Sequence, residues 1–360
     1  MKRKILFITN HRIGRSPGQR FRFEQYLGHL EKNGFDVHVS NIISKEDDAF
    51  LYKKGEYIKK ALLAKRAWKK RKEDLKKANE YDIIFIFREA LLTASTYFEK
   101  QFASSKAKII FDFDDAIWLP NVSAGNKALQ LLKRPSKTDE IIAHTDMVIA
   151  GNQYLADYAL GFCNNVKVIP TTIDTSYHIR KNRKQFDKIC IGWTGTQTTL
   201  KYLDVLKPVF HQLSEKFGDK IYFKIICDKA WEEEGLQLKN EAWNKEQEIQ
   251  QLEEIDIGVM PLVDDQWSRG KCGFKGLQYM AMESAAILSP VGVNTEIIEH
   301  GKNGFLAETE SDWLEQLSRL IENKELRLQI GKAGRLTVEQ KFSVNAYKNL
   351  YVKYLNEIID

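Results

Sequence analysis

The chain alternates short, continuous apolar stretches with longer stretches in which apolar residues recur every three or four positions. In its first part the continuous stretches cover residues 5–9, 37–42, 81–87, 107–115 and 146–152. Continuous apolar strands separated by helical patterns are typical of a parallel sheet that is covered on both faces. The pattern therefore predicts a doubly wound α/β domain, in which the first helix places Phe23, Tyr26, Leu27 and Leu30 on one face.

The same alternation returns after a polar, charged connection at residues 175–188. Further apolar stretches cover residues 188–195, 221–227, 255–262 and 286–290, and each is separated from the next by a helical pattern. A domain holds roughly 100–200 residues, so a chain of this length predicts two domains. We expect the first at residues 1–174 and the second at 175–342. Residues 343–360 form an amphipathic closing helix that we expect to dock on the first domain.

Composition narrows the class of protein. The chain is 43% hydrophobic and 29% charged, with a formal net charge of +6. Its apolar runs are far shorter than the roughly 20 residues that a membrane-spanning helix needs, and no signal-peptide core is present. We therefore expect a cytoplasmic protein. The four cysteines stand far apart without the spacing of metal ligands, so no metal cofactor is expected.

The segment "RGKCGFKGLQYMA", from Arg269 to Ala281, follows an apolar strand and runs into a helical pattern. A helix N-terminus offers unpaired N–H donors, and glycines let a phosphate approach the backbone. Lys271 and Lys275 would add full positive charges. The motif therefore indicates a site for a di- or polyphosphate, although glycines that serve only the turn and lysines that serve only solubility are an equal alternative.

Residues 256–307 resemble the retaining glycosyltransferases of family four, also called group 1. Two further segments strengthen the resemblance: "VGVNTEIIEHGKNGFLA", which contains Glu296, and "VKVIPTTID". The resemblance implies the GT-B fold, in which two Rossmann-like doubly wound domains face each other across a cleft. It also implies a nucleotide-diphosphate sugar as donor substrate, bound mainly by the second domain.

Carried over residue by residue, the resemblance is incomplete at the donor site. The two glutamates of the family motif fall on Gly270 and Gln278, so both acids are absent. Lys271 and Lys275 look like compensating features, as in a subgroup whose turn reads "GKCGFK". At the start of the second domain, the family's Arg falls on Thr196 and its Lys on Lys201. The implied donor-binding residues are Thr196, Gly270, Gly273, Phe274, Lys275, Gln278 and Glu296.

The segment "FDFDDAIW" ends a strand of the first domain with Asp112, Asp114 and Asp115. The resemblance implies that Asp114 takes the place of a histidine that contacts the donor sugar. Asp114 and Asp115 would then bind a sugar hydroxyl or activate the acceptor. A Mg²⁺ site and a plain turn cap are the alternatives. With Lys201 and Lys271, which would stabilise the leaving diphosphate, they complete the expected catalytic set.

Two basic features of the first domain suggest partners. Arg20 and Arg22 lie two positions apart in the first helix, where guanidinium groups would suit an acceptor that carries phosphate or carboxylate. The segment from Lys53 to Lys77 holds twelve Lys and Arg residues against three acids, with apolar residues among them. Such a helix suits an anionic membrane surface, or it packs its apolar stripe on the domain; no motif indicates nucleic-acid binding.

The sequence thus predicts a glycosyltransferase that moves a sugar from a nucleotide-diphosphate sugar to a glycan or lipid-linked acceptor. Retention of configuration and a role in cell-surface polysaccharide or glycoconjugate synthesis are implied by the resemblance, with peripheral attachment to the inner membrane face as an option. A nucleotide-sugar epimerase on the same fold and a non-catalytic sugar-nucleotide binder are the alternatives. The base, the sugar and the acceptor are not specified, because they depend on side chains whose mutual positions a sequence does not give.

Overall fold

A computed structural model describes residues 2–51, 53, 55–119, 134, 136–181 and 188–360. Residues 182–187 of the expected connection between domains and Lys54 of the basic segment lie outside this range. The chain divides into two compact units: unit 1 is Met1–Thr171 with Tyr347–Asp360, and unit 2 is Thr172–Ala346. The boundary expected after residue 174 lies a few positions beyond this division.

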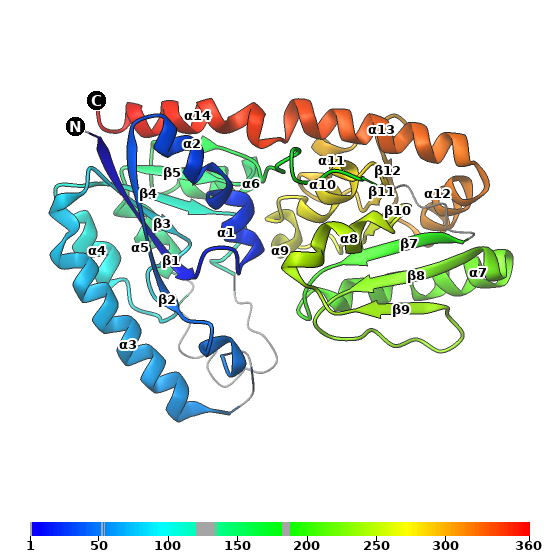
Figure 1. Cartoon of the computed structure of the whole chain (residues 1–360), viewed down its shortest axis with the longest axis horizontal. Helices are drawn as coiled ribbons and strands as arrows, with labels where there is room; N and C mark the ends of the chain where they lie inside the picture. Colours follow the sequence, from blue (N-terminus) through cyan, green and yellow to red (C-terminus); the bar gives the residue numbers. More distant parts are fainter. Residues whose placement is uncertain (1, 52, 54, 120–133, 135, 182–187) are drawn as a thin grey trace. The chain divides into compact units, whose positions relative to one another are not determined.

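Unit 1 is built on a six-stranded parallel sheet with the order β2-β1-β3-β4-β5-β6 (Figure 1). Register follows the apolar pattern, since Ile5 of β1 pairs with Val37 of β2 and with Ile83 of β3. The strands are β1 (Arg3–His11), β2 (Phe35–Ile43), β3 (Ile83–Phe87), β4 (Lys108–Phe113), β5 (Met147–Ala150) and β6 (Val166–Val168).

The first helix of unit 1 is broken, contrary to the single helix that the apolar spacing predicts. Phe23 leaves the helical region at φ −131° and ends the first piece, and a 3₁₀ turn at Glu24–Tyr26 leads into the second. The break lets Phe23 stack on Phe7, with ring centroids 5.0 Å apart. The helices of unit 1 are α1 (Pro17–Arg22), α2 (Leu27–Lys32), α3 (Tyr57–Lys76), α4 (Tyr97–Ala103), α5 (Lys137–Ala143), α6 (Gln153–Leu160) and most of α14 (Val344–Glu357).

Helix α14 packs on unit 1 although it follows all of unit 2 in the chain. The ring of Tyr351 is fully buried and stacks on Tyr26, with centroids 4.6 Å apart. Beyond it, the Arg3 guanidinium donates to Asp360 at 2.5 Å and also to Asn356. The apolar stripe read from the sequence therefore covers the helical segment that follows β1.

Unit 2 repeats the architecture with a second six-stranded parallel sheet, in the order β12-β11-β10-β7-β8-β9. Its strands are β7 (Ile189–Thr194), β8 (Ile221–Ile226), β9 (Leu238–Glu241), β10 (Ile257–Met260), β11 (Ala285–Leu288) and β12 (Phe305–Leu306). The edge strands β9 and β12 are short, and the apolar pattern did not indicate them. The two sheets with covering helices confirm the predicted fold class.

The helix expected from about Thr199 begins as a 3₁₀ segment, Leu200–Leu206, and becomes α-helical only in α7 (Lys207–Phe217), where Pro208 occupies the first turn. Proline is well placed there because its missing N–H has no helical acceptor. The remaining helices are α8 (Glu248–Glu253), α9 (Gln266–Arg269), α10 (Phe274–Ala281), α11 (Asn294–Ile297), α12 (Glu310–Glu322) and α13 (Lys324–Lys341). Within the described ranges, no helix combines the length and the apolar character that spanning a membrane requires.

Candidate functional site

Three loops of unit 2 converge at one edge of its sheet. They follow β7, β10 and β11, which are neighbours in the parallel sheet, so their carboxyl ends lie together. The loops carry Gly195–Thr199, Asp264–Gly273 and Ser289–Val293. In an open parallel sheet, loops at the carboxyl ends of the strands form the ligand-binding edge.

Lys275 is a half-buried lysine in the first turn of α10. Its Nζ lies 4.1 Å from the ring centroid of the buried Trp193 and donates to Thr199 Oγ1 at 3.3 Å. Burial, and then the like charge of Lys271, hold the pKa of Lys275 well below its usual value. Among the described residues no carboxylate pairs with it. A half-buried lysine without an anionic partner is a binding point for an anionic ligand, whose charge favours the ammonium form.

Lys271 and Lys201 gather around one tyrosine. The Nζ of Lys201 lies 5.2 Å from the Tyr202 ring centroid, and the Nζ of Lys271 lies 5.9 Å from it and 5.7 Å from Trp267. The Tyr202 ring is itself buried, and Ser268 donates a hydrogen bond to its hydroxyl at 3.3 Å. The structure thus brings together three lysines that the sequence singled out at separate positions.

Two glycines allow these loops to meet. A Cβ built on Gly195 would lie 2.3 Å from the Trp193 ring and 2.8 Å from Lys275 Nζ, so only glycine permits this approach. Gly273 adopts φ +66° at the N-cap of α10, and a Cβ there would lie 2.2 Å from Ile297 of α11. The left-handed turn at Gly273 directs the chain into α10, whose first N–H groups have no acceptor within the helix.

The remaining donor residues differ in accessibility. Thr196 is exposed, and its carbonyl accepts the Thr199 hydroxyl at 3.0 Å, which links it to Lys275. Glu296 is exposed on α11, whereas Gln278 is only 2% exposed. The Gln278 side chain makes no hydrogen bond within the described part of the chain. Gly270 ends α9 and contributes backbone alone, with its N–H bonded to the Trp267 carbonyl.

In unit 1, Asp114 and Asp115 share one guanidinium. Arg88 approaches Asp114 to 2.6 Å and Asp115 to 2.5 Å, and the two carboxylates raise the pKa of Arg88 against the effect of its burial. Arg88 follows β3 with φ +63°, which is unusual for a residue with a side chain, and its N–H donates to the Asp112 carbonyl. Both carboxylates of the expected catalytic set are thus paired with one guanidinium in this structure.

Arg22, for which the sequence suggested an acceptor role, has its guanidinium inside unit 1. Arg22 is fully buried, forms a two-point ion pair with Asp112, and donates to the Ile169 carbonyl. A guanidinium used in this way fixes α1 to β4 and to the chain after β6. Asp112 is likewise buried and belongs to this pair rather than to a ligand site. Arg20 is half-buried, with its guanidinium 4.9 Å from the Phe21 ring.

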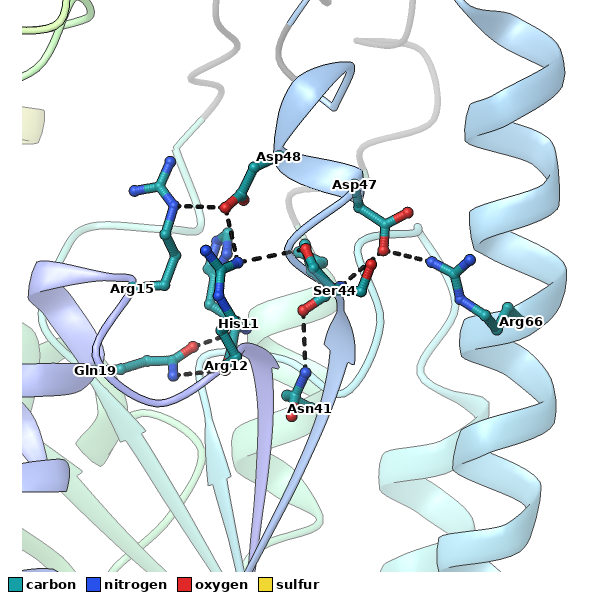
Figure 2. A network of polar contacts seen from close by, with 10 residues as sticks. His11, Arg12, Arg15, Gln19, Asn41, Ser44, Asp47, Asp48 and Arg66 are labelled. Carbon is teal, nitrogen blue, oxygen red and sulfur yellow. Dashed lines mark hydrogen bonds and ion pairs between the residues drawn. The ribbon is translucent and has the colours of Figure 1, made fainter.

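A polar network lies at the ends of β1 and β2 in unit 1 (Figure 2). Asp48 accepts from Arg12 at 2.7 Å and from Arg15 at 3.0 Å, while Gln19 bonds both the N–H and the carbonyl of His11 at 2.9 Å. Burial, followed by the charge of Arg15, lowers the pKa of His11 to about 4. His11 is therefore neutral at physiological pH, and the network fixes the loop after β1.

Sequence reasoning missed Trp193, Tyr202 and Arg88. The two aromatic residues read as ordinary core positions of a strand and a helix, and nothing in their spacing tells that lysines from distant loops approach them. Arg88 left a weak signal, because a basic residue stands directly after the continuous apolar strand β3. Among the described residues, no group of three or more His, Cys, Asp or Glu side chains is arranged to hold a metal ion.

A model of a known protein family matches most of unit 2. Residues 188–323 match the family model described as glycosyl transferases group 1. The matched range contains all three lysines around Trp193 and Tyr202, together with Gly270, Gln278 and Glu296. A search of curated protein sequences finds no match to this chain.

Solved structures share the fold over nearly the whole length. Sucrose-phosphate synthase from Thermosynechococcus elongatus aligns with a TM-score of 0.73 at 12% identity, covering 99% of each chain. A glycosyltransferase from Rickettsia africae gives 0.69 at 15% identity, covering 100% of this chain and 99% of that one. Anabaena HepE, solved with UDP and glucose, gives 0.69 at 14% identity, covering 99% and 100%. The chain therefore shares the GT-B fold of these structures, and residues 188–323 of its unit 2 are similar to the glycosyl transferases of group 1.

Proposed function

We propose that the protein transfers a sugar from a nucleotide-diphosphate sugar, bound by unit 2, to a glycan or lipid-linked acceptor recognised by unit 1. The observation that carries the donor assignment is Lys275, a half-buried lysine at the start of α10 with no carboxylate partner in the described chain. Anabaena HepE, of the same fold, was solved with UDP-glucose, which supports a donor of this class.

In the proposed mechanism, the lysines stabilise the charge that develops on the leaving diphosphate. Lys275 stands in the first turn of α10, and the Nζ atoms of Lys201 and Lys271 lie 5.2 Å and 5.9 Å from the Tyr202 ring centroid. Charges fixed before the reaction lower the barrier without reorganisation when the glycosidic bond breaks. Asp114 and Asp115 would hold hydroxyl groups of the sugar or of the acceptor. We further propose that the anomeric configuration is retained and that the product is a cell-surface polysaccharide or glycoconjugate.

The test is a thermal-shift screen against UDP-, GDP-, ADP- and dTDP-sugars and the free diphosphates, because a ligand that binds only the folded state raises its melting temperature. One base series should stabilise the protein. Lys271→Ala and Lys275→Ala should each weaken binding of the diphosphate at least about tenfold, or about 1.4 kcal/mol. Lys220→Ala and Lys245→Ala, at exposed positions without ion pairs in the described chain, are the controls.

The assignment fails if Lys271→Ala and Lys275→Ala bind donor and turn over as the wild type does. Acceptor trials with the stabilising donor then separate the possible activities. Transfer of the sugar supports the proposal, conversion of the donor alone would indicate an epimerase, and tight binding without reaction across a wide acceptor panel would indicate a non-catalytic protein.

A further inference from the structure

One face of α3 in unit 1 has a composition that the fold does not explain. The helix packs inward with Leu63, Ala67, Arg71 and Asp74, which are all buried. Arg71 is tied to the Ala90 carbonyl at 2.8 Å and to Asp74 at 2.9 Å. The contacts that hold α3 in unit 1 therefore come from one side of the helix. The residues on its opposite side are not needed for folding.

The opposite side forms a stripe of exposed residues spaced four and three apart, which we call the outer stripe. Residues at this spacing share one helix face. Its first two members are large and apolar, with Ile58 79% and Leu62 60% exposed, beside Tyr57 at 59%. Lysines occupy the rest of the face. The outer stripe is Ile58, Leu62, Lys65, Lys69, Lys72 and Lys76.

The lysines of the outer stripe carry uncompensated charge. Other basic residues of this helix are paired: Lys59 with Glu56 at 3.0 Å, Lys70 with Asp74 at 3.4 Å, and Arg66 with Asp47. Within the described ranges, no acid pairs with any of the four lysines of the outer stripe. Glu73 is the exposed acid nearest to them, so the four lysines keep a net positive line along the helix.

We propose that the outer stripe of α3 docks on an anionic lipid bilayer. Ile58 and Leu62 enter the interfacial layer, and the four lysines contact the phosphates of the headgroups. Charge complementarity selects an anionic partner. The apolar residues favour lipid over nucleic acid or an acidic protein surface. A bilayer interface buries the exposed aliphatic side chains, whereas contacts with phosphates alone leave them in water. The proposal concerns unit 1 and is independent of the donor site.

The experiment is sedimentation of the full chain with vesicles of phosphatidylcholine alone and of phosphatidylcholine mixed with phosphatidylglycerol. The wild type should bind the anionic vesicles and not the neutral ones, with binding weakened by salt. A lysine near an anionic bilayer strengthens binding about fivefold. The combined change Lys65→Glu, Lys69→Glu, Lys72→Glu and Lys76→Glu should therefore lower binding by at least about 100-fold.

Matched controls separate this surface from general charge and apolar exposure. The same reversals at Lys220, Lys245, Lys324 and Lys332, exposed lysines of unit 2 without ion pairs in the described chain, should leave most binding intact. Ile58→Ser with Leu62→Ser should weaken binding at high salt. Leu160→Ser with Leu336→Ser, at positions 49% and 52% exposed, should not. Melting curves confirm that each variant is folded.

Three results would overturn the proposal. In the first, the wild type does not bind anionic vesicles. In the second, the lysine variant of the outer stripe binds them as well as its unit 2 counterpart does. In the third, duplex DNA binds the wild type as tightly as the vesicles do and the Ile58 and Leu62 changes have no effect, which would assign the stripe to a polyanion instead.

Discussion

Lys275 combines two properties that rarely occur together in a lysine. It is withdrawn from water against Trp193, and it has only the Thr199 hydroxyl as a hydrogen-bond partner among the described residues. Burial lowers its pKa, whereas the π-face of Trp193 attracts the ammonium form. A bound diphosphate would add two negative charges and return the pKa toward its ordinary value. Binding of the diphosphate should therefore be coupled to uptake of a proton.

This coupling can be measured by titration calorimetry of a nucleoside diphosphate at several pH values from 8 to 10, in buffers of different ionisation enthalpy. A terminal phosphate has a pKa near ~6 and is ionised there, so the proton comes to the protein. The wild type should take up protons on binding. Lys275→Arg should bind with no uptake, because a guanidinium is always charged. Equal uptake by both proteins would place the titrating group elsewhere.

His11 gives a prediction for stability. Its pKa is about 4 in the folded protein, because it is buried and close to Arg15, against 6.5 in the unfolded chain. Between these values the unfolded chain binds the extra proton, so the stability of the fold falls as the pH falls through this window. The loss attributable to His11 should reach about 3 kcal/mol near pH 4 and vanish above pH 6.5.

Urea unfolding of the wild type and of His11→Asn at several pH values isolates this effect. The variant cannot take up that proton, so its stability relative to the wild type should rise steadily as the solution is acidified. A constant difference between the two proteins from pH 7.5 to pH 4.5 would show that His11 titrates normally.

The sequence indicated which charged residues stand in turns, but it did not indicate which buried side chains they contact. Lys271 and Lys275 were singled out because they stand in a glycine-rich turn before a helix, where the helix N-terminus favours an anion. The position of Trp193 under Lys275 could not, because it depends on the packing of β7 beside β10. The burial of Arg22 could not be predicted for the same reason: its partner Asp112 lies ninety positions away, and only the fold brings the two side chains together.

At the scale of elements, the loop after β7 depends on the absence of a side chain at Gly195. Gly195→Ala would place a methyl group 2.3 Å from the Trp193 ring and 2.8 Å from Lys275 Nζ, so both must shift. We expect at least a tenfold loss in donor affinity, or about 1.4 kcal/mol, with a smaller effect on stability. Binding measured by calorimetry tests this.

Gly28→Ala is the matched control. Gly28 lies in α2, and a Cβ there would meet no atom within 4 Å. Alanine should leave donor affinity unchanged and stabilise the helix by up to about 1 kcal/mol. If Gly195→Ala behaves like this control, the close approach of the loop to Lys275 is not required for binding.

Strands and helices were not equally predictable. Continuous apolar runs identified the central strands, because a strand buried on both faces has no polar side to confuse the pattern. The edge strands β9 and β12 escaped notice because they are short and partly exposed. The helices after β1 and β7 were predicted at the correct positions, but each was predicted as one continuous helix. Periodicity does not reveal a break such as that at Phe23, where packing against Phe7 determines the backbone.

At the scale of the whole molecule, unit 1 depends on residues from both ends of the described chain. Tyr351 of α14 is buried on Tyr26, and its hydroxyl has no hydrogen-bond partner within the described part of the chain. Tyr351→Phe removes that hydroxyl and should stabilise the protein by about 1 kcal/mol. Tyr351→Ala should destabilise it by about 3–5 kcal/mol through the cavity it leaves.

Chemical unfolding of Tyr351→Phe and Tyr351→Ala measures both changes in stability. A loss of stability in Tyr351→Phe would mean that the hydroxyl is hydrogen-bonded after all. A near-neutral Tyr351→Ala would mean that α14 contributes little to unit 1.

The return of α14 to unit 1 has a consequence for biosynthesis. Domains usually fold as they emerge from the ribosome, the earlier one first. Here residues 347–360 are made after all of unit 2, so the unit that is begun first is finished last. A nascent chain that stops at residue 346 would carry a complete unit 2 and an open unit 1 that exposes Tyr26. Chaperones and proteases would then act on the amino-terminal half of the protein, although the defect lies in the part of the message that encodes the carboxyl-terminal helix.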